Sequence, residues 1–277
     1  MSPIVYELDG FPILLHSATQ LPHIKQAFPL YGTNVGRLAR TVAAAVPDLT
    51  ILDIGANVGD TVATLRRYCA APILCVEGCD EYLTLLKENL RQFFDVEIEE
   101  GFVGSGEVAA KLVVEKGTAF MEPGEHGGVM TTRPLRQILE RHPRFGEGGG
   151  ARLWKIDTDG WDAFILQNNI EVVGAVRPVV FFEYDPHFFV GKLSGSSGVF
   201  EALRGEGYHD VLFWENTGDF HLRTNLGERA LIQDLHESVA GRNKSRYWDV
   251  AAFPRELGEL AGRQRDEEIA VFRKARA

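Results

Sequence analysis

Cysteine is scarce in this chain. Its 277 residues include three cysteines, Cys69, Cys75 and Cys79, whose spacing matches none of the usual zinc-binding patterns. We therefore expect reduced thiols that are buried and pack as small apolar side chains, and we identify no metal-ligating set in the sequence.

Long apolar runs and a basic leader segment are also missing. No stretch of about 18 uncharged apolar residues occurs, so we do not expect a membrane span. Residues 1–15 carry Glu7 and Asp9 and lack the basic start and apolar run of a signal peptide. These features lead us to expect a cytoplasmic protein.

Positive charge is in deficit as well. The formal net charge is −10, and lysines and arginines are dispersed along the chain. Such a surface repels a phosphate backbone, so nucleic acid is not an expected partner. One local group of arginines is interpreted as a solvated helix face, with a binding patch as the alternative: Arg133, Arg136, Arg141 and Arg144.

What the sequence does contain is an ordinary globular composition, 45% hydrophobic and 25% charged, arranged as alternating strands and helices. Five strands are predicted at residues 51–54, 73–76, 96–100, 153–156 and 179–182. Most of these are continuous apolar runs separated by helical periodicity, which is typical of a parallel sheet covered on both faces. The alternating polar and apolar residues of 96–100 favour a position near the sheet edge.

Three further segments surround this core. Residues 1–48 are expected to form an N-terminal extension, with a hairpin turning at Asp9-Gly10 and an amphipathic helix. Residues 49–255 form the main α/β domain, which contains an inserted hairpin near 108–114 and ends in an antiparallel pair around Asn216-Thr217-Gly218. Residues 256–277 form a charged helix that we expect to cap the domain, with pairing in a homodimer as the alternative.

The turn after the first core strand is the clearest candidate for a binding site. It reads Asp53-Ile54-Gly55-Ala56-Asn57-Val58-Gly59-Asp60, whereas a dinucleotide turn requires G-x-G-x-x-G. Its two glycines allow a sharp bend and a close approach to a ligand. An anionic pyrophosphate favours a helix N-terminus, whereas the ammonium and sulfonium of S-adenosylmethionine are favoured by an aspartate at the strand end. The turn therefore favours S-adenosylmethionine as cofactor.

A second acidic side chain follows the next strand. Glu77 lies 22 residues after Gly55 and can accept hydrogen bonds from both ribose hydroxyls, and Gly78 leaves room for the ribose. The alternative is that Glu77 caps the following helix. In the loop after the third strand, Phe102 and Val103 are expected over the adenine, with a core position as the alternative for Phe102. The predicted cofactor-binding residues are Asp53, Gly55, Ala56, Asn57, Gly59, Asp60, Thr61, Glu77, Gly78, Phe102 and Val103.

Catalytic candidates follow from the rule that ligands of open α/β sheets bind beyond the carboxyl ends of the strands. Asp157 directly follows the fourth strand and is the first choice for a general base, with capping of the next helix as the alternative. His126 and Glu183 are further candidates, and His187 is another loop histidine. Asp157, Asp159 and Glu183 could instead hold a divalent cation, although their spacing follows no fixed ligand pattern. Lys155 points either into the sheet or toward this rim.

The motifs described above follow one another in an order that resembles the FkbM family of class I methyltransferases. The resemblance extends from about Tyr31 to Phe253. The resemblance is carried by ILDIGANVGDT at 51–61, VEGCDEYLTLLKENL at 76–90 and LWKIDTDGWDAFIL at 153–166. The segments VVFFEYDP at 179–186 and RYWDVAAF at 246–253 agree less specifically. Many members carry a glutamate where this chain has Asp159, which keeps the charge and shortens its reach.

The resemblance implies a Rossmann-like sheet of seven strands in the order 3-2-1-4-5-7-6 with helices on both faces. It also implies O-methylation of a small-molecule or carbohydrate acceptor, such as a sugar, glycolipid, polysaccharide or natural-product hydroxyl. Two other readings stay open. One is a nicotinamide-dependent oxidoreductase, and the other is a cofactor-binding protein without turnover.

Overall fold

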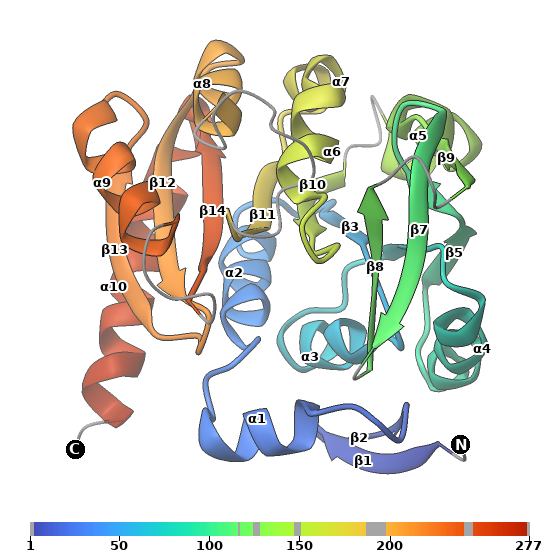
Figure 1. Ribbon diagram of the computed structural model, residues 1–277. Coiled ribbons are helices and arrows are strands. Elements are labelled where there is room, and N and C mark those ends of the chain that lie inside the picture. The colour runs from blue at the N-terminus through green and yellow to red at the C-terminus, as the bar shows by residue number, and fades with distance from the viewer. Residues whose placement is uncertain are drawn as a thin grey trace.

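The computed structural model describes residues 3–115, 117–123, 128–146, 151–186, 198–240 and 246–275. Its main sheet has eight strands in the order β13-β12-β14-β11-β10-β3-β4-β5 (Figure 1). The strands are β3 (Thr50–Ile54), β4 (Ile73–Glu77), β5 (Val96–Glu100), β10 (Ala151–Ile156), β11 (Val179–Tyr184), β12 (Tyr208–Glu215), β13 (Phe220–Asn225) and β14 (Trp248–Pro254).

The predicted strand order is confirmed for seven of these strands, and the predicted number is wrong by one. Strands β3, β4, β5, β10 and β11 pair in parallel, whereas β14 is antiparallel to both β11 and β12. The eighth strand is β13, which pairs antiparallel with β12 at the sheet edge. The second half of the predicted terminal hairpin is therefore a full member of the sheet.

Two apolar layers enclose the sheet. Every residue of β3 and β4 is buried, which explains their continuous apolar sequences, whereas the edge strand β5 is largely half-exposed. One face packs against α2 (Asn34–Ala43), α3 (Asp60–Tyr68), α4 (Asp80–Asn89) and α10 (Gly258–Ala275). The other face packs against α5 (Leu135–Arg141), α6 (Asp162–Asn168), α7 (Ile170–Val176), α8 (Gly198–Gly205) and α9 (Arg229–Ala240).

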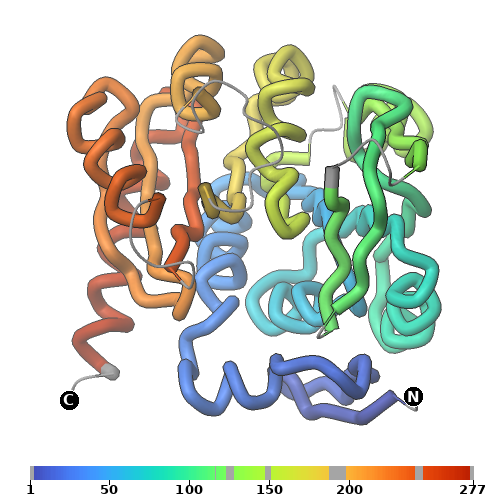
Figure 2. The backbone as a smooth tube through the Cα atoms, in the orientation of Figure 1, coloured from blue at the N-terminus to red at the C-terminus, as the bar shows by residue number. Residues whose placement is uncertain are grey.

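The N-terminal segment forms the predicted hairpin, β1 (Ile4–Leu8) and β2 (Phe11–Leu15), followed by α1 (Leu21–Ala27). Asp9 and Gly10 both have positive φ, as a tight two-residue turn requires. Asn89 of α4 holds the hairpin by accepting from the Leu14 N–H at 2.7 Å and donating to the Leu14 carbonyl at 2.9 Å. The hairpin and α1 lie together below the sheet in the view of Figure 2.

The inserted segment is larger than predicted. Strands β7 (Glu107–Glu115) and β8 (Thr118–Pro123) form the expected hairpin, but β9 (Val129–Arg133) pairs with β7, and β6 (Phe102–Val103) pairs with β9. The result is a four-stranded sheet in the order β6-β9-β7-β8. Short 3-10 turns at η1 (Leu90–Gln92), η2 (Pro143–Phe145) and η3 (Arg255–Leu257) complete the elements.

The C-terminal helix α10 packs against α2 through a buried ion pair. Arg37 donates to the two carboxylate oxygens of Glu268 at 2.8 and 2.7 Å. Among the described residues, no helix is both long and apolar enough to cross a membrane. Cys69, Cys75 and Cys79 are free thiols, and two of them, Cys75 and Cys79, are buried.

Candidate functional site

Two cavities open beside each other at the carboxyl ends of β3, β4 and β10. The first, the slot, is narrow, with a volume of about 60 Å³, and the second, the chamber, has a volume of about 390 Å³. Gly55, Asn57, Asp157 and Asp159 line both cavities. The predicted edge of the sheet therefore carries a small binding space that leads into a larger one.

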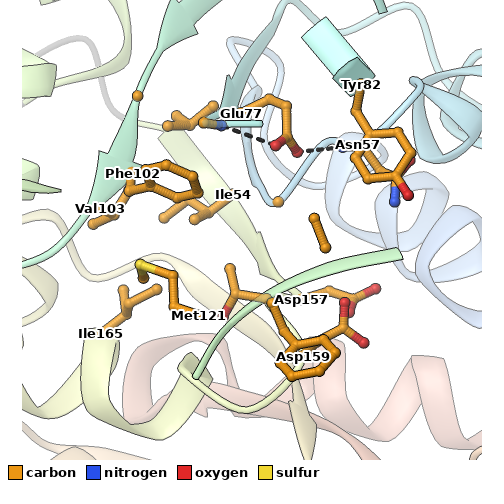
Figure 3. A pocket seen from close by; sticks show the side chains of 17 residues that line it. Ile54, Asn57, Glu77, Tyr82, Phe102, Val103, Met121, Asp157, Asp159 and Ile165 are labelled. Atoms are coloured by element: carbon orange, nitrogen blue, oxygen red, sulfur yellow. Dashed lines mark hydrogen bonds between the residues drawn. The ribbon is translucent and has the colours of Figure 1, made fainter. Parts of the chain in front are cut away.

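The slot is mostly apolar with a single acidic wall. Phe102 and Val103 lie on one side and face Met121 and Ile165 on the other, while Glu77 closes the top (Figure 3). Tyr82 also lines the slot, and its hydroxyl has no hydrogen-bond partner among the described residues. A flat, apolar ligand with a polar end matches this lining.

The first glycine of the predicted turn makes the expected sharp bend and also leaves room for a neighbouring strand end. Gly55 has φ +79°, and a Cβ built on it would lie 1.9 Å from the carbonyl oxygen of Asp157. The glycine therefore allows a close approach between the ends of β3 and β10, and its approach to a ligand stays a prediction. Gly59 is left-handed at the start of α3, and its Cβ would lie 3.0 Å from Leu86 of α4.

Glu77 organises the turn as well as the slot wall. Its Oε2 accepts from the Asn57 N–H at 2.8 Å, and its Oε1 accepts from the N–H groups of Gly78 at 2.9 Å and Cys79 at 2.8 Å. Cys79 is the N-cap residue of α4, and its own side chain makes no capping hydrogen bond. Glu77 thus ties the β3 turn to the β4 turn and also holds the backbone N–H of the N-cap residue, as the capping alternative proposed.

The space beside Gly78 is filled by protein. A Cβ on Gly78 would lie 2.5 Å from the ring of Phe102, so the glycine makes room for that ring against the strand end. Phe102 is half-buried, packs on the core and lines the slot at the same time. The core position of Phe102 is therefore confirmed, and its contact with adenine stays a prediction that its place in the slot allows.

Asp53 is placed differently from expectation. It is fully buried and lines neither cavity, and its Oδ1 lies 3.2 Å from Lys155 Nζ. Burial raises the pKa of Asp53 to about 6, although Lys155 opposes that rise. Because Lys155 already neutralises this carboxylate, Asp53 supports the floor of the site instead of facing a ligand.

Lys155 sits at the centre of this floor. Its ammonium donates to the Gly55 carbonyl at 3.1 Å and lies 3.4 Å from Asp157 Oδ2. Burial alone lowers the pKa of Lys155, but Asp157, Asp53 and Asp60 outweigh that effect and raise it above its ordinary value. Lys155 is thus a fixed positive charge that points toward the rim, an orientation that the sequence left open.

The remaining predicted cofactor residues divide into two groups. Ala56 is buried and, like Gly59, lines neither cavity. Asp60 and Thr61 line the chamber, where burial raises the pKa of Asp60. The first turn of α3 therefore faces the larger space, not the slot.

Asp157 has the position predicted for a reacting carboxylate. Its side chain is 48% exposed and lines both cavities. The alternative role in capping α6 is not observed, since no side chain caps that helix. Instead, Asp162 holds the preceding loop by accepting from the Thr158 hydroxyl at 3.0 Å and the Thr158 N–H at 3.3 Å.

The inserted sheet forms one wall of the site, which sequence reasoning missed. The Thr118 hydroxyl donates to Asp159, and the buried Trp161 Nε1–H donates to the Met121 carbonyl at 2.7 Å. These two bonds fasten β8 to the loop after β10, and Met121 then lines the slot. The sequence signal was Trp161 itself, because a buried indole N–H usually has an acceptor.

The N-terminal segment forms another wall. Lys25, Tyr31 and Asn34 line the chamber together with Tyr247, which precedes β14. Lys25 Nζ donates to the Tyr31 carbonyl at 2.7 Å. None of these side chains was predicted, because their approach to the sheet edge depends on how the extension folds back over it.

Two acidic side chains face each other across neighbouring strands of the chamber. Glu183 of β11 is directly opposite Asp249 of β14, and both line the chamber. Burial, followed by Asp157 and Asp159, raises the pKa of Glu183 well above its ordinary value. Burial raises the pKa of Asp249 to about 7, opposed by a 2.7 Å hydrogen bond from Asn34 Nδ2. Glu183 was predicted as a site residue, and Asp249 was missed.

Two other predictions concern histidines and metal ions. His126 and His187 lie outside the described residues. Within the described ranges, no group of three or more histidine, cysteine, aspartate or glutamate side chains is arranged to hold a metal ion.

Asp249→Asn should flatten the pH dependence of stability. The folded pKa of about 7 lies above the ordinary aspartate value, so the native state binds more protons than the unfolded chain from about pH 4 to 7, and stability falls as pH rises. The variant lacks this loss, so from pH 5 to pH 8 its free energy of unfolding should fall by about 3 kcal/mol less than that of the wild type. Urea unfolding of both proteins at the two pH values measures the difference, and parallel curves would contradict it.

No family profile matches this chain, and no curated protein matches it significantly. Three similar solved structures are a precorrin-6y C5,15-methyltransferase from Geobacter metallireducens GS-15, a ribosomal protein L11 methylase from Lactobacillus delbrueckii subsp. bulgaricus and an Aeropyrum pernix fibrillarin with natively bound S-adenosyl-L-methionine. Their identities are 14%, 15% and 12%, with TM-scores of 0.41, 0.40 and 0.39. The alignments cover 75%, 79% and 74% of this chain and 80%, 78% and 68% of theirs. Similarity at this level identifies no function, so the function has to be inferred from the site.

Proposed function

We propose that this chain is an S-adenosylmethionine-dependent methyltransferase that methylates a hydroxyl of a sugar, glycolipid, polysaccharide or natural product. The observation that carries the proposal is that an apolar slot opens into a larger polar chamber, with Asp157 on the wall of both. A donor in the slot and an acceptor in the chamber would meet beside this carboxylate. Membership of the FkbM family stays a prediction from the sequence motifs.

The slot residues fit the adenosyl part of the cofactor. Phe102, Met121 and Ile165 offer apolar faces to an adenine ring. Glu77 Oε2 accepts only the Asn57 N–H, so it keeps an acceptor site for a ribose hydroxyl. The Tyr82 hydroxyl offers a further polar contact in the same space.

The charges around the junction also fit a cationic donor. Asp157 and Asp159 lie where the slot meets the chamber, and Asp60 lines the chamber close by. The sequence suggested that Asp53 would attract the ammonium and sulfonium of the donor, but Asp53 already pairs with Lys155. In this proposal Asp157, Asp159 and Asp60 attract those positive groups instead. Negative side chains stabilise a sulfonium and an ammonium through short-range Coulomb attraction.

The chemistry then requires alignment and removal of one proton. When bound, S-adenosylmethionine supplies a methyl group activated by its positive sulfur. Asp157 accepts the proton of the acceptor hydroxyl, and Lys155, 3.4 Å away, holds this carboxylate in place. Alignment of the two reactants in adjoining cavities contributes about 7–11 kcal/mol in favourable cases.

Calorimetry tests the cofactor assignment. We expect the purified protein to bind S-adenosylhomocysteine and not NADH, because the slot has an acidic wall at Glu77 and lacks the dinucleotide glycine pattern. Binding of NADH alone would support the oxidoreductase reading. Failure to bind S-adenosylhomocysteine would overturn the proposed function.

Asp157→Asn tests the proton acceptor. We expect turnover to fall by about 10²–10⁴-fold, because the amide cannot accept the proton, while the affinity for S-adenosylhomocysteine changes little. The measurement is methyl transfer to an acceptor found by screening, with calorimetry alongside. Asp266→Asn, an exposed carboxylate on α10, is the matched control. Unchanged turnover in the Asp157 variant would remove this residue from the role.

A further inference from the structure

The facing pair Glu183 and Asp249 has no obvious structural purpose. Side chains directly opposite each other in an antiparallel pair have Cβ atoms about 4.5–5.5 Å apart, and like charges at such positions are destabilising. Burial makes the cost larger, since it is the main cause of the raised pKa of both groups. A pair of this kind is expected where a bound group compensates it.

Among the described residues no cation forms an ion pair with either group, although Lys155 acts on Asp249 from a distance and lowers its pKa. Asp249 accepts a hydrogen bond from the neutral amide of Asn34, and Glu183 has neither a hydrogen bond nor an ion pair among the described residues. The two lysines of the chamber are already engaged. Lys25 donates to the Tyr31 carbonyl, and Lys155 lies between Asp53, Asp157 and the Gly55 carbonyl.

Acidic side chains outnumber lysines in the chamber. Five carboxylates line it against two lysines. S-adenosylmethionine, with a sulfonium, an ammonium and a carboxylate, adds a net charge of only about +1, so the imbalance persists when the proposed donor is bound. The five carboxylates are Asp60, Asp157, Asp159, Glu183 and Asp249.

Aromatic side chains adjoin the acidic pair. Phe181 lies two residues before Glu183 on the same face of β11, and Tyr247 lies two residues before Asp249, while Tyr31 comes from the N-terminal segment. Glu183 and Asp249 both contribute to the raised pKa of the two tyrosine hydroxyls, which places these groups near one another. Aromatic faces beside carboxylates are a favourable environment for an ammonium group and for the apolar face of a sugar.

We propose that the acceptor carries a protonated amine, held between Glu183 and Asp249, and that this charge selects the acceptor. The inference rests on the proposed function and names the chemical class of its substrate, an amine-bearing polyol such as an amino sugar. A bound ammonium favours the ionised form of both carboxyl groups and is attracted to them, whereas a neutral polyol only forms hydrogen bonds with the pair. A divalent cation would require a group of ligands that the described residues do not form.

The test compares an amine with its hydroxyl analogue. D-Glucosamine and D-glucose are titrated into the protein at pH 7, with and without saturating S-adenosylhomocysteine, and binding is followed by ligand-observed NMR. We expect glucosamine to bind on the order of 10- to 100-fold more tightly, as for hydrogen bonds to charged groups. Equal binding, or no binding of either sugar at millimolar concentration, would overturn the proposal.

The double variant E183Q/D249N identifies the pair as the cause. It should lose the preference for glucosamine while its affinity for S-adenosylhomocysteine stays that of the wild type. E259Q, which removes a carboxylate that is 92% exposed on α10, should keep the preference. A preference that survives in the double variant would assign selection to other residues. Should Mg²⁺ raise the unfolding temperature of the wild type and not of the double variant, the pair would be a metal site instead.

The two proposals fail separately. If S-adenosylhomocysteine does not bind the wild type, the proposed function fails, and the preference for the amine can still be measured without it. If S-adenosylhomocysteine binds and the amine preference is missing, only the substrate class is wrong.

Discussion

Glu77→Gln should weaken the binding of S-adenosylhomocysteine by about 10- to 100-fold, the effect expected on losing a charged acceptor in a buried site. Its carboxylate holds three backbone N–H groups from two turns and lines the slot. The oxygen of a glutamine can still accept some of these hydrogen bonds. Its NH₂ group cannot accept any, so the backbone N–H groups on that side lose their acceptor. The variant therefore disturbs the wall of the slot and weakens the acceptor for the ribose hydroxyl. Calorimetry with S-adenosylhomocysteine measures the loss of affinity.

The control for this variant is Glu100→Gln. Glu100 ends β5 directly beside Glu77 in the sheet register, yet it is 56% exposed, pairs with Lys87 and does not line the slot. It should bind S-adenosylhomocysteine as the wild type does. Thermal unfolding without ligand separates loss of binding from loss of fold. Equal affinity of the Glu77 variant and the wild type would remove Glu77 from the cofactor site.

Gly55→Ala should cost about 3 kcal/mol or more of unfolding free energy, the largest stability effect expected at this site. The added Cβ would lie 1.9 Å from the Asp157 carbonyl oxygen and 2.9 Å from its carbonyl carbon, on a backbone with φ +79°. The obstructing atoms are backbone, so the ends of β3 and β10 must separate. Urea unfolding measures the loss, and we expect binding of S-adenosylhomocysteine to fall with it, because Gly55 lines both cavities.

Gly10→Ala distinguishes the clash from the strain of a positive φ. Gly10 has φ +93°, and a Cβ there would have no atom within 4 Å. This variant should lose only about 1–2 kcal/mol, the cost of placing an L-residue in the left-handed region. If the two variants lost equal stability, the contact between the two strand ends would not be the cause.

The sequence alone determined the part of the site that follows from local pattern. A buried strand followed by a glycine turn fixed the position of Gly55, and parallel pairing brought Glu77, Asp157 and Glu183 to the same edge because all parallel strands end on the same side. These residues line the two cavities as a consequence of strand position. The order of the core strands was implied by the family resemblance and not by any local pattern.

Only the tertiary structure decided which charges are free and which residues close the site. Asp53 and Lys155 lie on adjacent strands in register, and their pairing cancels a charge that the sequence assigned to a ligand. Asp249 reaches Glu183 through the antiparallel register of β14, and Tyr31 and Met121 arrive on segments folded over the edge. Such neighbours depend on contacts between segments far apart in the chain, whose relative placement is set by the packing of the whole molecule and has no local sequence pattern.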